Sequence, residues 1–249
     1  MAEVALITGA SAGLGAEFAR QLSRRGHRLV LVARRLERLE ELAADLDNAR
    51  AVAMDLSRPG AAGKLIADLE HHGETVGLLV NNAGFGLAGQ FAELDGKRQR
   101  EMIDLNCGAL ADLAHAVLPG MIGRGSGAVL NVASTAAFQP GPGMAVYFAT
   151  KAFVLSFSEA LHDEAKPHGV KVSCLCPGPT RTEFRSVSGF DPKGRLAKLS
   201  ADAASVVRTG LEGLNRNQAV VVPGLANKAI AQVHRLMPRA VMRRAARMR

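Results

Sequence analysis

Two side chains that could together move a proton, Tyr147 and Lys151, lie four residues apart, and Ser134 precedes the tyrosine by thirteen residues. A tyrosine hydroxyl has an ordinary pKa of about 10, so it acts as an acid–base catalyst at neutral pH only where its anion is stabilised. Residues four apart on a helix share a face, which would bring the Lys151 ammonium near the Tyr147 oxygen. We therefore expect Lys151 to lower the pKa of Tyr147, and a decrease of about three units would require on the order of 4 kcal/mol.

The pair also has a purely structural interpretation, in which a half-buried tyrosine stands beside a surface lysine. Tyr147 is the only tyrosine of the chain, however, and the residues from Met144 to Ala149 are mostly apolar, which disfavours a solvated helix face. These residues alone leave both interpretations open, and the N-terminal segment favours the catalytic one.

A glycine-rich segment near the N-terminus indicates a site for a dinucleotide. Residues 3–8 are typical of a short buried strand, and an amphipathic helix with Phe18 and Leu22 on one face follows the glycines. Glycines let the backbone approach a pyrophosphate, whose charge a helix N-terminus favours. The expected binding residues are Gly9, Ser11, Gly13, Leu14 and Gly15. A tight strand-to-helix turn without a ligand is the structural alternative.

With these residues in view, the chain resembles the short-chain dehydrogenase/reductase family from Val4 to about Pro223. The motifs that carry the resemblance stand in order: residues 8–15, Asn81-Asn82-Ala83-Gly84, Asn106, Ser134, Tyr147 with Lys151, and residues 177–182. Residues 33–35, 147–164 and 176–184 further resemble a bacterial branch often labelled DltE-like, which is similar to 3-oxoacyl-CoA and hydroxysteroid reductases. The resemblance implies an enzyme that interconverts a carbonyl and an alcohol, and it fixes no substrate.

The order of apolar runs predicts an α/β fold. After the first strand, strand-like runs alternate with helical segments, at residues 29–33, 51–54, 78–80, 128–133, 170–175 and 219–222. Such alternation is typical of a parallel sheet with helices on both faces. Right-handed crossovers and the family resemblance imply a Rossmann-type, doubly wound, seven-stranded sheet in the order 3-2-1-4-5-6-7, with the ligand at the carboxyl ends of the strands.

Composition favours one catalytic domain. The chain has 249 residues, of which 48% are hydrophobic and 22% charged, enough to bury a full core. We predict a cofactor-binding catalytic domain over residues 1–227, with a substrate lid at about 184–200, and a basic helical extension over residues 228–249. The three cysteines suggest no disulfide framework, and a strand beginning near Met1 leaves no room for a signal peptide, so a cytoplasmic location is expected.

No cluster of residues has a convincing metal-ligand spacing, so we expect no metal site. Two of the cysteines, Cys174 and Cys176, lie two apart in a strand-like run. We expect them to face opposite sides of the sheet as buried small residues.

The end of the second strand indicates which nicotinamide cofactor binds. Enzymes that use NAD usually carry a carboxylate there, which would repel the 2′-phosphate of NADP. This chain has Arg34 and Arg35 instead, and a guanidinium suits phosphate, so NADP(H) is the predicted cofactor, with Arg34 favoured because it directly follows the strand. The structural alternative makes both arginines part of an ordinary solvated loop.

The family resemblance implies the remaining site residues. Asp55, with Leu56, would contact the adenine, although Asp55 could instead cap a helix beginning near Ser57. The remaining cofactor contacts would come from Asn82, Ala83, Gly84, Tyr147, Lys151, Pro177, Gly178, Thr180 and Thr182, with Thr182 reaching the nicotinamide carboxamide.

Four residues would carry the catalysis. Ser134 would donate to the substrate carbonyl, Tyr147 would supply the proton, and Lys151 would hold the nicotinamide ribose. Asn106 would hold a water that links Lys151 to solvent, or would be a polar helix residue that bonds to backbone. Apolar lid residues, Phe184 among them, suggest a lipophilic or acyl substrate. A protein that binds NADP as a signal, with little turnover, is the competing hypothesis.

The C-terminal segment carries the excess positive charge. Of the 31 Lys and Arg, seven follow residue 227, and the remaining 24 nearly balance the 23 Asp and Glu, so the net charge of +8 gives no reason to expect nucleic-acid binding. Helical stripes predicted here could dock over the substrate cleft or a partner subunit, contact an anionic membrane, or remain solvated. No stretch of the sequence is expected to span a bilayer. The resemblance implies a homodimer or homotetramer.

Overall fold

A computed structural model describes residues 1–184, 188–189, 200–236 and 241 of the chain. Its strands are β1 (Ala2–Thr8), β2 (Leu29–Ala33), β3 (Ala49–Ala53), β4 (Glu74–Asn81), β5 (Gly127–Val132), β6 (Val170–Leu175) and β7 (Val220–Val221). All seven pair in parallel in the order β3-β2-β1-β4-β5-β6-β7, which confirms the predicted fold.

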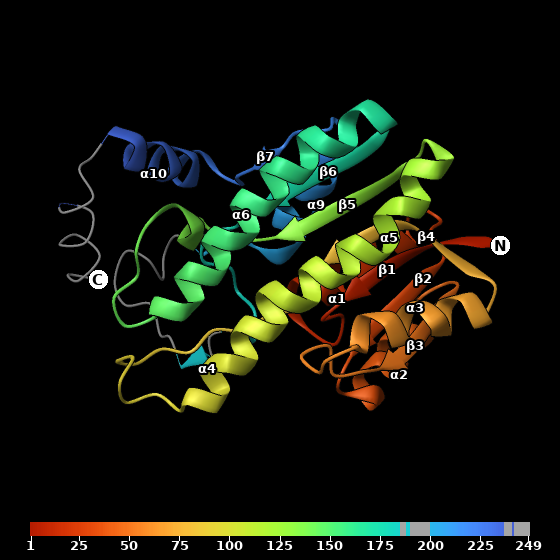
Figure 1. Cartoon of the computed structure of the whole chain (residues 1–249), viewed down its shortest axis with the longest axis horizontal. Helices are drawn as coiled ribbons and strands as arrows, with labels where there is room; N and C mark the ends of the chain where they lie inside the picture. Colours follow the sequence, from red (N-terminus) through yellow and green to blue (C-terminus); the bar gives the residue numbers. More distant parts are fainter. Residues whose placement is uncertain (185–187, 190–199, 237–240, 242–249) are drawn as a thin grey trace.

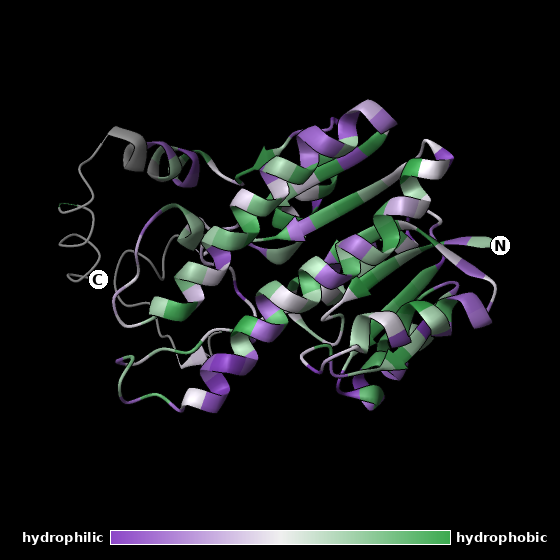
Figure 2. Cartoon of the chain, viewed as in Figure 1, coloured by the Kyte–Doolittle hydropathy of each residue, from purple (hydrophilic) through white to green (hydrophobic). Residues whose placement is uncertain are grey.

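Helices cover both faces of this sheet (Figure 1). The helices are α1 (Gly13–Ser23), α2 (Leu36–Ala44), α3 (Ala61–His71), α4 (Gly96–Ile103), α5 (Leu110–Arg124), α6 (Ala145–Ala165), α9 (Ala203–Asn215) and α10 (Leu225–Leu236). Helices α3, α5 and α6 bury apolar residues against one face, and α1, α2 and α9 against the other. Figure 2 shows the hydrophobic residues concentrated along the strands between these two layers.

Strands β3 and β4 extend furthest beyond their predicted limits, and partly buried ion pairs satisfy the polar residues there. Strands β3 and β4 begin at Ala49 and Glu74, before the apolar runs that predicted them. Arg50 on β3 donates to Glu74 on β4 and to Asp68 on α3, so charged groups can lie at the start of both strands. Local patterns of apolar residues cannot predict an ion pair between residues far apart in the sequence.

The expectation for two of the cysteines was wrong. Residues two apart on a strand share a face, because successive side chains point to opposite sides. The Sγ atoms of Cys174 and Cys176 accordingly lie 3.8 Å apart, and both residues are fully buried in a small cluster with Val154.

A π-helical segment (Asp104–Ala109) joins α4 to α5 in one continuous helix. By length and composition alone, this helix, Gly96–Arg124, could cross a membrane, contrary to the sequence expectation. It packs here against the sheet and against α3 and α6, which accounts for its apolar residues.

The described part of the C-terminal segment forms α10, which begins at Leu225, before the predicted boundary at residue 228. It packs against the short 3₁₀ helix η2 (Thr135–Phe138), and Ala231 is buried. Beyond Leu236, the predicted helical extension lies outside the described residues apart from Val241.

Candidate active site

The carboxyl ends of the strands open into a cavity of about 550 Å³. It lies beside β1 and β4, where the order of strands reverses, which is the usual place for a ligand in a doubly wound sheet. Among the residues predicted for the site, those that line the cavity are Gly9, Ser11, Gly13, Leu14, Arg34, Arg35, Asp55, Leu56, Asn82, Ala83, Gly84, Ser134, Tyr147, Lys151, Pro177, Gly178, Thr180 and Thr182. Gly15 and Asn106 are predicted site residues that do not line it.

Gly15 lies behind the glycine turn, where only a glycine fits. A Cβ atom at Gly15 would lie 2.2 Å from the carbonyl oxygen of Gly9 and 2.7 Å from Nδ2 of Asn82. Gly9 itself has a φ of +66° and would place a Cβ 2.9 Å from the backbone of Ala83. These glycines therefore allow the turn after β1 to pack closely on the loop after β4, whether or not a ligand is bound.

Hydrogen bonds tie the glycine turn to the loop after β4. The Thr8 hydroxyl accepts from the backbone N–H groups of Asn82 and Ala83 at 3.0 and 2.9 Å. Asn82 returns a hydrogen bond from Nδ2 to the Thr8 carbonyl at 2.9 Å. No side chain caps the N-terminus of α1, where Ala12 is the N-cap residue, so its first N–H groups can face an anion in the cavity.

The arginine whose placement best suits a phosphate is Arg35. Its Nη2 donates to Ser11 Oγ at 3.1 Å and to Glu183 Oε2 at 3.2 Å. The sequence favoured Arg34, which also lines the cavity and whose charge contributes to lowering the pKa of Asp55. The position of an arginine directly after β2 therefore does not decide whether its side chain reaches the glycine-rich segment.

Asp55 stabilises a turn instead of capping a helix near Ser57, and its contact with the adenine stays a prediction. Its Oδ1 accepts from the N–H and hydroxyl of Ser57 at 3.1 and 2.6 Å, so it stabilises a local turn, while the next helix begins later, at Ala61. Burial opposes ionisation, and these hydrogen bonds, with the nearby arginines, hold the pKa of Asp55 below its usual range. Asp55 nevertheless lines the cavity and remains open to a ligand.

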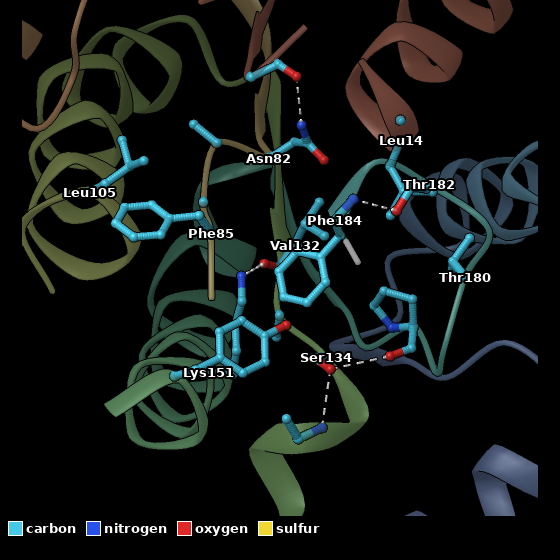
Figure 3. A pocket seen from close by; sticks show the side chains of 18 of the residues that line it. Leu14, Asn82, Phe85, Leu105, Val132, Ser134, Lys151, Thr180, Thr182 and Phe184 are labelled. Atoms are coloured by element: carbon cyan, nitrogen blue, oxygen red, sulfur yellow. Dashed lines mark hydrogen bonds between the residues drawn. The ribbon is translucent and has the colours of Figure 1, made fainter. Parts of the chain in front are cut away.

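Ser134, Tyr147 and Lys151 converge at the other end of the cavity, with Ser134 and Lys151 labelled in Figure 3. Ser134 caps η2, where its Oγ accepts from the Ala136 N–H at 3.1 Å and donates to the Pro177 carbonyl at 3.4 Å. Lys151 Nζ donates to the Val132 carbonyl at 2.8 Å and lies 5.9 Å from the centre of the Tyr147 ring. Helix α6 thus places Tyr147 and Lys151 on the face that looks into the cavity.

The pKa of Tyr147 differs from the expectation. Burial raises it to about 12, and the only opposing effect is a hydrogen bond with Ser134, not the Lys151 ammonium. Burial lowers the pKa of Lys151 to about 8. Desolvation outweighs the interaction predicted from the spacing, because both side chains are almost fully covered, with exposed fractions of 8% and 6%.

The Asn106 side chain bonds to protein groups, as in the structural alternative. Its Oδ1 accepts from the Phe85 N–H at 3.0 Å, and its Nδ2 donates to the Phe85 carbonyl at 2.9 Å and to Thr150 Oγ1 at 3.1 Å. The side chain therefore fixes the loop that contains Gly84. It lies in the π-helical segment, a feature frequent at functional sites, and the water-holding role stays a prediction.

Several lining residues were not predicted as site residues. An apolar group beside Tyr147 includes Met144, Phe148 and Phe184, and the Phe184 and Tyr147 ring centres are 5.3 Å apart. Figure 3 shows Phe184 among the side chains that line the pocket together with Lys151 and Ser134. Most of the predicted lid beyond Phe184 lies outside the described residues.

Asn227 also lines the cavity and comes from the first turn of α10, directly before the predicted C-terminal segment. Its Nδ2 donates to the Pro223 carbonyl at 2.8 Å, and a Cβ at Gly178 would lie 2.5 Å from its amide. The start of α10 is therefore docked beside the cleft. The sequence did not predict Asn227 as a site residue. The expectation that the C-terminal segment docks over the substrate cleft was the one signal that favoured residues near it.

Comparison with known proteins places the chain among dehydrogenases. The family model described as short chain dehydrogenase matches residues 3–191. A curated relative, the NADP-dependent 3-hydroxy acid dehydrogenase YdfG of Escherichia coli (strain K12), is 37% identical over 198 residues, covering 78% of this chain and 80% of its own.

Two solved structures are similar over nearly the whole chain. A short-chain dehydrogenase from Sphingobium yanoikuyae in complex with NADPH is 38% identical, with a TM-score of 0.82 over 90% of this chain and 89% of that one. A bulky-bulky ketone specific alcohol dehydrogenase from Comamonas testosteroni is 31% identical, with a TM-score of 0.78 over 96% of each chain.

Proposed function

The chain belongs to the short-chain dehydrogenase/reductase family, and we propose that it reduces a lipophilic carbonyl compound with NADPH or oxidises the corresponding alcohol with NADP. The observation that carries the proposal is one cavity that contains a dinucleotide-type glycine turn at one end and Ser134, Tyr147 and Lys151 at the other. Family membership supports carbonyl and alcohol redox chemistry in general.

The residues present fit a dinucleotide. The glycine turn brings backbone close to the cavity, the N-terminus of α1 has no side-chain cap, and Ser11 and Arg35 add a hydroxyl and a guanidinium. A 2′-phosphate suits these donors, and the similar structure from Sphingobium yanoikuyae holds NADPH. The cofactor, when bound, supplies the hydride. Asp55, Asn82 and Thr182 would complete its contacts.

The protonated form of Tyr147 is ready to act in the reductive direction. With a pKa of about 12, its hydroxyl keeps its proton at neutral pH and can donate it to a developing alkoxide. Ser134 would orient the carbonyl oxygen toward this proton. Lys151, whose ammonium bonds to the Val132 carbonyl, would position the ribose and stabilise the tyrosinate that follows proton transfer.

Apolar side chains support a lipophilic substrate. Phe85, Met144, Phe148 and Phe184 lie around Tyr147 and line the cavity there. A hydrophobic ketone, aldehyde or acyl group would displace water from this end on binding. One similar structure is specific for bulky ketones, which agrees with an apolar site of this kind.

The competing hypothesis, a signalling protein that binds NADP without turnover, has no use for buried Tyr147 and Lys151 beside the substrate end. Purified protein should be titrated with NADPH and NADH and then assayed with aliphatic, aromatic, steroid and 3-oxoacyl carbonyls. Tyr147→Phe should lower turnover by about 10²–10⁴-fold with cofactor affinity unchanged. Turnover equal to wild type would refute the mechanism.

The domain organisation, location, assembly and C-terminal segment of the protein are also matters of proposal. We propose a single catalytic domain in the cytoplasm, assembled as a homodimer or homotetramer. We propose that the C-terminal segment docks beside the substrate cleft, since α10, which continues into this segment, contributes Asn227 to the cavity directly before it. Removal of residues 228–249 should then alter substrate kinetics, whereas loss of liposome binding alone would favour membrane contact.

A further inference from the structure

One carboxylate in the cavity holds the guanidinium groups that a phosphate would need. Glu183 follows Thr182 in the loop after β6, and its Oε1 and Oε2 accept from Arg38 at 2.6 Å and from Arg35 at 3.2 Å. Both arginines belong to the segment after β2, far from Glu183 in the sequence. The ion pairs therefore join the two sides of the cofactor cavity.

These partners form an anion site of the kind that recognises a phosphate monoester. Two guanidinium groups, of Arg35 and Arg38, contact the Glu183 carboxylate, and the Nη2 of Arg35 also donates to the Ser11 hydroxyl. A planar guanidinium binds carboxylate and phosphate in the same way. Both arginines hold the pKa of Glu183 below its usual range, and the carboxylate therefore stays charged at neutral pH.

A 2′-phosphate would have to displace the Glu183 carboxylate from these arginines. A phosphate bound by Arg35 and Ser11 would lie beside the charged Glu183, and like charges at this separation repel. A cofactor without a 2′-phosphate would not meet this conflict.

We propose that Glu183 occupies the 2′-phosphate subsite in the cofactor-free protein and competes with NADP(H), but not with NAD(H), for Arg35, Arg38 and Ser11. The inference rests on the proposed function, because it assumes a cofactor with a 2′-phosphate. It makes Glu183 and Arg38 specificity-determining residues. Glu183 weakens the affinity for NADP(H), and its release shifts the peptide that precedes Phe184, which packs on the Tyr147 ring.

The test measures binding to the full chain by calorimetry, with 2′,5′-ADP and 5′-AMP as probes that differ in the 2′-phosphate, and with NADPH and NADH. Glu183→Gln removes the competing charge and keeps the size of the side chain. It should tighten binding of 2′,5′-ADP and NADPH by roughly three- to tenfold, the range expected when two exposed ion pairs no longer have to break. Affinities for 5′-AMP and NADH should stay within about twofold.

Glu212→Gln is the matched control, because Glu212 forms a similarly exposed pair with Arg216 on α9, away from the cofactor cavity. It removes the same charge and should change none of the four affinities. If Glu183→Gln tightens all four ligands equally, leaves 2′,5′-ADP unchanged or weakens it, the competition is refuted. If wild-type protein binds NADH as tightly as NADPH, the proposed cofactor fails first, whatever the variant does.

Discussion

Replacing Asn106 with alanine separates the two roles that this residue could have. The change removes three hydrogen bonds, to the Phe85 N–H, the Phe85 carbonyl and the Thr150 hydroxyl, from a side chain that is 1% exposed. Each is worth about 1 kcal/mol, and the two buried groups of Phe85 add a desolvation cost when left without partners. We expect the free energy of unfolding to fall by about 3–5 kcal/mol, which lowers the Tm by roughly 6–20 °C.

Function should change through the loop that Asn106 fixes. Gly84 lines the cavity directly before Phe85, so a loosened loop should weaken NADPH binding and raise the KM for NADPH. Loss of a bound water on a proton path would instead lower kcat and leave cofactor affinity unchanged. Thermal unfolding followed by circular dichroism, calorimetric binding and steady-state kinetics on the same preparations distinguish the two.

Asn131→Ala provides the comparison. Asn131 is fully buried as well, accepts from Asn81 Nδ2 at 3.0 Å and donates to the Ser158 hydroxyl at 2.9 Å, and it contacts no residue of the Gly84 loop in these hydrogen bonds. It should lower the Tm and leave the affinity for NADPH unchanged. A Tm for Asn106→Ala within about 2 °C of wild type, or equal losses of affinity in both variants, would refute the reasoning.

Two further predictions concern the glycine turn and the buried lysine. Gly15→Ala should lower the free energy of unfolding by about 1–3 kcal/mol in urea unfolding, because its Cβ would meet the Gly9 carbonyl at 2.2 Å. Gly63→Ala, with open space around it in α3, should raise the free energy of unfolding by up to about 1 kcal/mol. Equal effects of the two substitutions would contradict the packing argument. Burial lowers the pKa of Lys151 from 10.5 to about 8, so the unfolded chain binds the extra proton between these values and the cost of burial is relieved as pH rises. Wild type should therefore gain on the order of 3 kcal/mol relative to Lys151→Met between pH 8 and 10.5, and a pH-independent difference would exclude the shift.

Local patterns of the sequence predicted the fold class and the glycine turn, and the family resemblance supplied the strand order and most of the other cavity residues. The run from β1 through the glycines into α1 predicted a strand, a turn and a helix, and the alternation of apolar runs predicted a parallel sheet with helices on both faces. Helical spacing likewise placed Tyr147 and Lys151 on one face of α6. These inferences hold because side-chain direction follows from the backbone period, which is a local property.

Contacts between distant segments could not be predicted in this way. The pairing of Glu183 with Arg35 and Arg38, the bonding of Asn106 to Phe85, and the entry of Asn227 into the cavity each join residues that no spacing relates. Strand ends at Ala49 and Glu74 were missed for the same reason, since a partly buried ion pair replaces the apolar pattern there.

The sequence by itself determined which groups could do the chemistry, because residue types and short spacings fix shared faces and turns. Only the tertiary structure decided their protonation and their partners. Burial raises the pKa of Tyr147 and lowers that of Lys151, in place of the expected stabilisation of the phenolate by Lys151. Desolvation depends on everything packed around a group, and this is assembled only when the chain has folded.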